Sequence, residues 1–312
     1  MMDYKELFDK IYKLTKKEKT VDELAEILEM KDYEVLGLIH LMRESGYIID
    51  CVDRKIVQTQ NDLVNKEGFF IPKDKSHIKF LALSDTHCGS KWDNLDLIKH
   101  AYDIAEKEGC DFVTHSGDIL EGDFHNKRPD HIYQVKALGM EQVDYVINNY
   151  PKSKLQTYFI TGNHDLTFVK TCGADVGKMI SKERPELIYL GQDLADLKFE
   201  KIKIRLRHGA GSASYSKSYK LQKYCETLPI SEIPNIILQG HFHYSGYFKN
   251  RNIYCFNVPS LQGYTPFAKA MGMESEMGFW LIDLYTDSKG NINRINPELY
   301  NFEEKKILKR KR

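Results

Sequence analysis

Residues 81–87 read Leu-Ala-Leu-Ser-Asp-Thr-His, an apolar run that ends abruptly in Asp85 and His87. A short apolar run of this kind predicts a buried β-strand, with the two polar residues at its carboxyl end. Open α/β sheets bind their ligands at the carboxyl ends of their strands. Because carboxylate and imidazole are both metal-ligand types, the stretch predicts an α/β fold with a functional site at this sheet edge.

Four further segments repeat the pattern of a hydrophobic stretch followed by ligand-type residues. A lone Asp-x-His is a weak signal, because it is more often a turn or a surface pair than a metal site. The other segments are Ser-Gly-Asp at 116–118, Gly-Asn-His-Asp at 162–165, Arg-His-Gly at 207–209 and Gly-His-Phe-His at 240–243. Gly117, Gly162 and Gly240 each precede a ligand-type residue, which predicts tight turns where a side chain would obstruct the site.

From residue 77 onward, strand and helix patterns alternate. We expect a strand to Asp85, a helix over 93–108, a strand over 110–118, a helix over 131–149 and a strand over 154–162. Such alternation predicts a largely parallel sheet with crossover helices. Strand pairs expected near 197–207, 246–258 and 278–300 indicate a second sheet.

The order of these motifs resembles the calcineurin-like metallophosphoesterases over roughly residues 78–290. The resemblance implies an α/β fold in which two sheets stack between helical layers, a four-layer αββα sandwich that we assign to residues 78–302. It also implies a binuclear metal centre. In that centre Asp85, His87 and His243 would bind one metal, Asn163, His208 and His241 would bind the other, and Asp118 would bridge both.

These residue types suit phosphoryl-transfer chemistry. Two cations about 3.5 to 4 Å apart can share a hydroxide, lower the pKa of its parent water and clamp the attacking and leaving oxygens at phosphorus. A bridging carboxylate offsets part of the repulsion between the ions. Because a mixed nitrogen and oxygen set suits transition metals better than calcium or magnesium, we expect two divalent transition-metal ions, with manganese preferred and iron, zinc or nickel as alternatives.

His164 and Asp165 are the candidate catalytic residues. Since Asn163 occupies the ligand position, the resemblance leaves His164 facing the substrate, where an imidazolium could stabilise developing charge and protonate the leaving oxygen. Asp165 would hold the tautomer and orientation of this imidazole, with a helix cap as the alternative. The phosphoprotein phosphatases of the family carry Gly-Asn-His-Glu, so Asp165 also argues against a phosphoserine phosphatase.

Residues 1–65 predict a small α+β unit. Apolar faces indicate helices over 3–15, from a capping box at Thr20 to near Met30, and over 32–45, followed by a hairpin that turns at Asp53. Three helices followed by a hairpin resemble a winged helix-turn-helix module, which implies DNA binding through the third helix. The charges oppose that role, because the unit holds ten Lys or Arg against fourteen Asp or Glu. Protein docking or dimerisation is an equal alternative.

Polar segments flank the main domain. Residues 66–77 are expected to form a linker, and residues 303–312 a tail with six Lys or Arg that could bind polyanions. Over the whole chain, 45 Lys plus Arg balance 45 Asp plus Glu, so no global charge favours nucleic acid or a membrane surface. The amino terminus lacks a signal-peptide core, no stretch approaches the roughly 18 apolar residues of a membrane span, and six cysteines without a Cys-x-x-Cys pair indicate reduced thiols. We therefore expect a cytoplasmic protein without a membrane partner, and homo-oligomerisation stays open.

Two stretches are candidate substrate contacts. The loop over 122–129 follows Asp118, so His125 and Arg128 could meet a substrate phosphate. This loop resembles the corresponding loop of double-strand-break repair nucleases in the same family, and a solvated charged loop is the alternative. Residues 214–224 interleave tyrosines with lysines, including Lys217 and Tyr219, as a surface that tracks a nucleic-acid strand would, and an ordinary amphipathic helix is the alternative.

These features favour a metal-dependent phosphoesterase that hydrolyses nucleic-acid phosphodiester bonds by attack of a metal-bridging hydroxide, with DNA as the favoured partner. The second hypothesis is a phosphatase or phosphodiesterase for a small nucleotide or phosphomonoester, whose first unit serves assembly or regulation. The third is a DNA- or protein-binding regulator with a scaffold phosphoesterase domain. The complete set of ligand-type residues argues against this third hypothesis, since binding alone would not require it.

Overall fold

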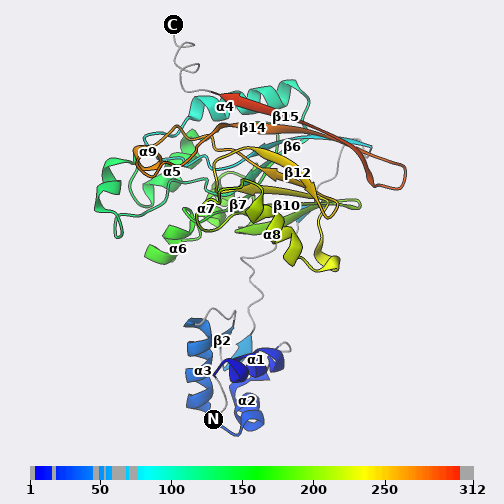
Figure 1. Cartoon of the computed structure of the whole chain (residues 1–312). Helices are drawn as coiled ribbons and strands as arrows, with labels where there is room; N and C mark the ends of the chain where they lie inside the picture. Colours follow the sequence, from blue (N-terminus) through cyan, green and yellow to red (C-terminus); the bar gives the residue numbers. More distant parts are fainter. Residues whose placement is uncertain are drawn as a thin grey trace. The chain divides into compact units, whose positions relative to one another are not determined.

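The structure is a computed structural model that describes residues 4–15, 19–44, 49–52, 54–57, 68–69 and 76–302. The chain divides into two compact units, Met1–Leu63 and Val64–Arg312 (Figure 1). Asp53 at the expected hairpin turn, most of the expected linker and the whole basic tail over 303–312 lie outside the described residues.

The described residues of the first unit form three helices and a small antiparallel sheet. The helices are α1 (Tyr4–Leu14), α2 (Val21–Leu28) and α3 (Asp32–Glu44), and the strands β1 (Lys19–Thr20), β2 (Asp50–Val52) and β3 (Lys55–Val57) pair in the order β1-β3-β2. Ile11, Leu24 and Ile56 belong to one buried core. Thr20 and Glu23 form the predicted capping box at the start of α2, so the helices and the hairpin lie where the sequence pattern predicts them.

In the second unit, one sheet has the order β15-β14-β5-β6-β7-β8. Its strands are β5 (His77–Leu83), β6 (Phe112–Ser116), β7 (Thr157–Thr161), β8 (Leu187–Gln192), β14 (Met277–Thr286) and β15 (Ile292–Phe302). Strands β5 to β8 run parallel, with α4 (Leu95–Lys107), α5 (Glu141–Asn149), α6 (Leu166–Cys172) and α7 (Val176–Glu183) in their connections. The antiparallel hairpin of β14 and β15 extends the edge beside β5, and the predicted parallel sheet is confirmed.

A second sheet, also predicted, has the order β12-β13-β11-β10-β9-β4. The strand pair expected near 278–300 is not part of it, because β14 pairs with β5 and extends the first sheet instead. Its strands are β4 (Gly68–Phe69), β9 (Leu194–Phe199), β10 (Ile202–His208), β11 (Ile236–Gly240), β12 (Gly246–Asn250) and β13 (Ile253–Asn257). Strand β4 lies within the expected linker and pairs in parallel with β9. Because the Gly68 backbone packs closely against Leu190 and Leu197, this part of the expected linker belongs to the sheet.

Alternate side chains of the β5 sheet point into two different cores. Leu81 and Phe159 pack with the apolar faces of α4 to α7, whereas Phe80 and Ile160 pack with side chains of the second sheet. On the other face of the second sheet, α8 (Tyr219–Thr227) contributes the buried Leu221. The unit is therefore a four-layer αββα sandwich, with α4 and α8 on opposite outer sides (Figure 1).

Some connections differ from the sequence prediction. The helix expected over 131–149 is divided into a 3-10 turn (Pro129–Tyr133) and α5, because Val135 forms a bridge with Ser90 and Gly139 adopts a positive φ of 50°. The short helices α7 and α9 (Pro266–Ala270) and the 3-10 turn at Ile230–Glu232 were not predicted, because each is too short to show a clear hydrophobic period. Helix α6 was implied only by the helix-cap alternative for Asp165. Among the described residues, no helix has the length and apolarity that crossing a lipid bilayer requires.

Candidate metal centre

The five motifs lie at the carboxyl ends of β5, β6, β7, β10 and β11. Asp85, His87, Asp118, His241 and His243 all have a positive φ, between 44° and 84°. Non-glycine residues rarely adopt this left-handed conformation, whose cost is tolerated where surrounding contacts hold a functional loop in place. Backbone strain therefore coincides with five of the seven predicted metal ligands.

Asp85, His87 and His243 form one cluster. The Nε2 atoms of His87 and His243 are 3.1 Å apart. Asp85 Oδ1 lies 3.3 Å from His243 Nε2 and 3.9 Å from His87 Nε2. Two lone pairs directed at each other repel unless a proton or a cation lies between them, so one carboxylate oxygen and two imidazole nitrogens converge as the ligands of a transition metal would.

Asp118, His208 and His241 form a second cluster, which Asn163 joins. His208 Nε2 lies 3.1 Å from Asp118 Oδ2 and 3.1 Å from Asn163 Oδ1. In each of the groups Asp85–His87–His243, His87–Asp118–His164 and Asp118–His208–His241, one ligand atom per residue lies within 4.8 Å of the others, so these groups could hold metal ions. Asp118 is shared by two of them, which is the arrangement a bridging carboxylate requires.

Backbone carbonyls determine which nitrogen two of the imidazoles can offer to a metal. His208 Nδ1 donates to the Ser116 carbonyl at 2.8 Å, and His241 Nε2 donates to the Gly211 carbonyl at 2.8 Å. Because a carbonyl only accepts, these nitrogens carry the hydrogen. In the neutral imidazoles the lone pairs are therefore on His208 Nε2 and His241 Nδ1, and metal-binding histidines are commonly oriented by such contacts.

Burial and charge pairing together set the protonation of the centre. Burial opposes the charged form of His208, but the Asp118 carboxylate raises the pKa of His208 to about 10. Burial alone would raise the pKa of Asp118, because it disfavours the ionised carboxylate. The positive charges of His208 and His164 outweigh this effect and hold the pKa of Asp118 below its usual value. Burial lowers the pKa of His87 to about 3. Metal binding requires neutral imidazoles and ionised carboxylates, so cation uptake should release the proton held by His208.

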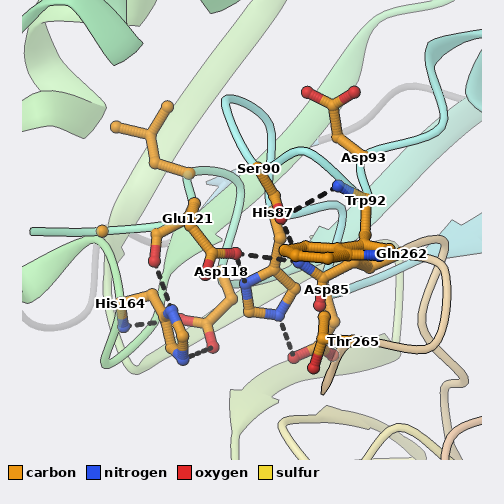
Figure 2. A network of polar contacts seen from close by, with 12 residues as sticks. Asp85, His87, Ser90, Trp92, Asp93, Asp118, Glu121, His164, Gln262 and Thr265 are labelled. Atoms are coloured by element: carbon orange, nitrogen blue, oxygen red, sulfur yellow. Dashed lines mark hydrogen bonds and ion pairs between the residues drawn. The ribbon is translucent and has the colours of Figure 1, made fainter. Parts of the chain in front are cut away.

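His164 packs edge-on against the rings of His87 and Phe124, with ring centroids 4.5 Å and 4.8 Å away. Its Nδ1 donates to the Glu121 carbonyl at 2.5 Å, and its backbone N–H donates to Asp118 Oδ1 at 2.8 Å. Figure 2 shows the imidazole beside Asp118 and Glu121. Because Nδ1 carries a hydrogen in both protonation states, Nε2 is the atom that exchanges a proton, and it lies 4.0 Å from Asp118 Oδ2.

The orienting contact predicted for Asp165 is made by the Glu121 carbonyl instead. The Asp165 carboxylate accepts backbone N–H groups of Leu120 at 2.8 Å, Gly162 at 2.8 Å and Ile119 at 3.2 Å. Asp165 does occupy the N-cap position of α6, as the alternative had it, but its side chain makes no capping hydrogen bond. The buried carboxylate ties the loop after β6 to the loop after β7.

Replacing Asp165 with asparagine is expected to lower the free energy of unfolding by about 2–4 kcal/mol, because the amide NH₂ would face backbone N–H groups and leave them unsatisfied. Urea unfolding followed by circular dichroism measures this loss. The matched control is Asp130→Asn at an exposed carboxylate, where we expect a change within about 0.5 kcal/mol. Equal stability of the two variants would contradict the bracing role of Asp165.

Glu121 and Gln262 belong to this centre although the sequence analysis missed them. Glu121 Oε2 lies 3.5 Å from His87 Nδ1 and accepts a hydrogen bond from Gln262 Nε2 at 2.8 Å. The same amide group contacts Ser90 Oγ at 3.0 Å (Figure 2). Glu121 could have been found as an acidic residue in a motif loop, three positions after Asp118, whereas Gln262 follows β13 and carries no motif.

Two of the motif glycines are required by close packing around His208. Gly117 has a φ of 96°, and a Cβ there would collide with the His208 ring. A Cβ at Gly162 would lie 2.7 Å from His208 Nε2. The tight turns predicted from the sequence therefore leave room for this imidazole.

The guanidinium of Arg128 is stacked between two aromatic rings beside the centre. It lies 5.0 Å from the Phe124 ring centroid and 4.6 Å from that of Phe267 in α9. Phe124 is the residue that packs against His164. Among the described residues the Arg128 guanidinium makes no ion pair and no hydrogen bond, so its in-plane N–H groups are available to an anion.

The other three substrate candidates are placed less favourably. Lys217 Nζ contacts Glu274 Oε1 at 2.6 Å and Glu276 Oε1 at 2.7 Å, so its charge is already paired. His125 is exposed and pairs with Asp123. Tyr219 is about half exposed at the start of α8, whose buried residues confirm an amphipathic helix in this stretch.

Two stacked sheets that direct carboxylates and imidazoles into adjoining clusters define an α/β sandwich protein with a candidate metal centre. Residues 78–274 match the family model described as the Calcineurin-like phosphoesterase superfamily domain, and the chain belongs to this superfamily. The resemblance drawn from the five motifs is thereby confirmed.

Comparison with solved structures finds proteins of distant similarity. A novel archaeal phosphodiesterase is 15% identical and aligns with 72% of this chain and 100% of its own, with a TM-score of 0.42. Vacuolar protein sorting 29 from Cryptosporidium parvum is 14% identical, with 73% and 100% covered and a TM-score of 0.41. A 5'-nucleotidase precursor from Thermus thermophilus is 12% identical, with 72% and 54% covered and a TM-score of 0.39. No curated protein matches the sequence.

Proposed function

We propose that this protein is a metal-dependent phosphoesterase that hydrolyses phosphodiester bonds of nucleic acid. The observation that carries the proposal is the convergence of three potential metal-binding groups, two of which share Asp118, with His164 Nε2 4.0 Å from the same carboxylate. A metal-dependent hydrolase needs both parts, a cation site and an adjacent proton donor.

The clusters suggest which residues would bind metal and which would donate a proton. One cation would be held by Asp85, His87 and His243, the other by Asn163, His208 and His241, and Asp118 would contact both. Two divalent cations in such a site supply Lewis acidity toward phosphoryl oxygens and lower the pKa of a nearby water. His164 Nε2 would protonate the leaving oxygen while the Glu121 carbonyl keeps the imidazole in position.

The charges beside the centre support a phosphodiester over a phosphomonoester. A phosphomonoester carries a charge of about −1.5 to −2 at neutral pH, whereas a diester carries one negative charge. Lys217 is neutralised by two glutamates, which leaves Arg128 as a flanking cation with free N–H groups. Its stacking between Phe124 and Phe267 resembles surfaces that bind nucleic-acid strands through aromatic rings and arginine.

A small nucleotide or phosphomonoester is the second candidate, and the first unit supports it. The basic residue of the hairpin turn, Arg54, contacts Asp22 at 2.6 Å and Asp32 at 2.5 Å. This pairing, added to the acidic surplus of the unit, leaves little positive charge for a nucleic acid. Under this alternative, the first unit serves assembly and the second unit acts on a soluble substrate.

A substrate panel tests the proposal. The protein is stripped of metal with EDTA, reloaded with Mn²⁺, Fe²⁺, Zn²⁺ or Ni²⁺, and assayed on single- and double-stranded DNA, RNA, bis-p-nitrophenyl phosphate and p-nitrophenyl phosphate. We expect metal-dependent cleavage of the diesters with slower release from the monoester. Preferred cleavage of the monoester would favour the second candidate, and bound metal without activity on any substrate would favour a scaffold.

Replacing Arg128 with alanine is expected to lower kcat/KM for an oligonucleotide by about 10- to 100-fold, because a charge-assisted contact to a neighbouring phosphate would be lost. The smaller bis-p-nitrophenyl phosphate has no neighbouring phosphate, so the ratio of the two kcat/KM values should fall. Lys127→Ala, at the adjacent exposed residue, is the control. Equal losses on both substrates would show that Arg128 does not contact a second phosphate.

A further inference from the structure

Helix α3 of the first unit is apolar on both of its faces. Val35, Leu38, Ile39 and Met42 are buried in the core of the unit. On the outer face, Tyr33, Leu36 and Leu41 are 65%, 40% and 47% exposed. A helix with one buried face normally turns polar residues outward, so this second stripe indicates a missing partner.

The stripe has the spacing of a helix-packing surface. Tyr33, Leu36, Gly37, His40 and Leu41 are exposed at positions i, i+3, i+4, i+7 and i+8. A Cβ added at Gly37 would meet nothing within 4 Å, so the fold of the unit itself does not require glycine there. Because glycine lowers helix stability, its presence at the centre of an exposed stripe fits the close approach of another helix.

Nucleic acid is a poor occupant for this face. The stripe itself is apolar, and the neighbouring Asp32 is acidic. Asp32 also takes part in the ion pair that neutralises Arg54. Since phosphate contacts supply much of the affinity for nucleic acid, a face of this composition favours a protein partner.

We infer that this face binds the same face of a second copy of the chain. In an antiparallel pair of α3 helices with a two-fold axis at Gly37, Tyr33 of one copy lies opposite Leu41 of the other, and Glu34 lies opposite His40. The exposed apolar residues Tyr33 and Leu41 thus meet each other, and an acidic side chain meets an imidazole. Such self-complementarity is what an isologous two-fold interface requires.

The size of the stripe sets the expected affinity. A few residues on one helix cover less than the roughly 800 Å² per partner of stable interfaces, so we expect a dissociation constant in the micromolar range. This association is independent of the proposed hydrolytic activity, and the two can be tested separately.

Sedimentation velocity of the full chain, from about 1 µM to about 200 µM, measures the association. We expect a rise from the 36.3 kDa monomer toward twice that mass. Leu41→Glu should keep the protein monomeric, and Ile230→Glu, at an isoleucine 86% exposed in the second unit, should leave association unchanged. His40→Glu should weaken association and His40→Lys should retain it, because the imidazole is predicted to face Glu34.

Two variants at Gly37 separate docking from folding. Gly37→Ala should weaken association at least tenfold while the Tm of the dilute protein stays equal or rises, since alanine favours the helix. Gly37→Cys, in a Cys172→Ser background that removes the exposed thiol, should form a disulfide-linked dimer on oxidation, unlike Ile230→Cys. A monomer at every concentration, or absence of that disulfide, would overturn the inference. So would DNA binding that Leu41→Glu abolishes, because the face would then serve nucleic acid.

Discussion

Replacing Asp118 with asparagine is expected to abolish binding of both metal ions and to lower kcat/KM by roughly 10³-fold or more. Asp118 is buried, contacts His208 Nε2 at 3.1 Å and is shared by two of the three potential metal-binding groups. Asparagine keeps the size of the side chain but removes the charge that offsets repulsion between two neighbouring cations. Metal content per chain, measured by mass spectrometry after dialysis, checks the first effect directly.

The matched control for this variant is Asp111→Asn. Asp111 stands just before the other end of the same strand β6, where its carboxylate accepts the Lys79 backbone N–H at 3.0 Å. We expect this variant to retain two metal equivalents and its activity. If Asp118→Asn also keeps two equivalents while circular dichroism shows a native fold, the shared carboxylate does not hold the metals and the proposed centre is wrong.

Replacing His164 with glutamine is expected to lower kcat by roughly 10²- to 10⁴-fold without loss of bound metal, because a general acid contributes about that much to rate. The loss should be largest for a nucleoside leaving group, whose oxygen needs a proton, and smallest for p-nitrophenolate, which leaves without one. The dependence of rate on leaving-group pKa is therefore the measurement that separates proton donation from simple positioning.

His100→Gln is the control for this second variant, since His100 lies on α4 and packs against Phe302. We expect unchanged kinetics there. A uniform decrease of His164→Gln on all leaving groups would instead assign His164 to substrate or metal positioning. Comparing Asp118→Asn with His164→Gln also separates loss of activity through lost metal from loss of activity through a missing proton donor, because only Asp118→Asn should empty the metal site.

The amino-acid sequence was sufficient to predict that there are two sheets and which ligand-type residues lie at their strand ends, although it gave no sign of β4 or β8. Runs such as Leu81–Leu83 before Asp85, and the matching motifs after β6, β7, β10 and β11, are local signals that need no knowledge of distant contacts. The ligand-type residues are therefore brought together as expected, since parallel strands end at one edge of a sheet. The capping box at Thr20 is equally local, because its two hydrogen bonds join residues three apart.

Only the tertiary structure decided which atoms these residues offer and what surrounds them. The Gly211 carbonyl selects the nitrogen of His241, and Glu121, rather than Asp165, orients His164. Gln262 donates a hydrogen bond to Glu121, which lies 141 residues away in the sequence, and Gln262 belongs to no recognisable motif. Each of these hydrogen bonds depends on how loops from different strands pack in three dimensions, whereas strand periodicity and motif identity depend on neighbours in the chain.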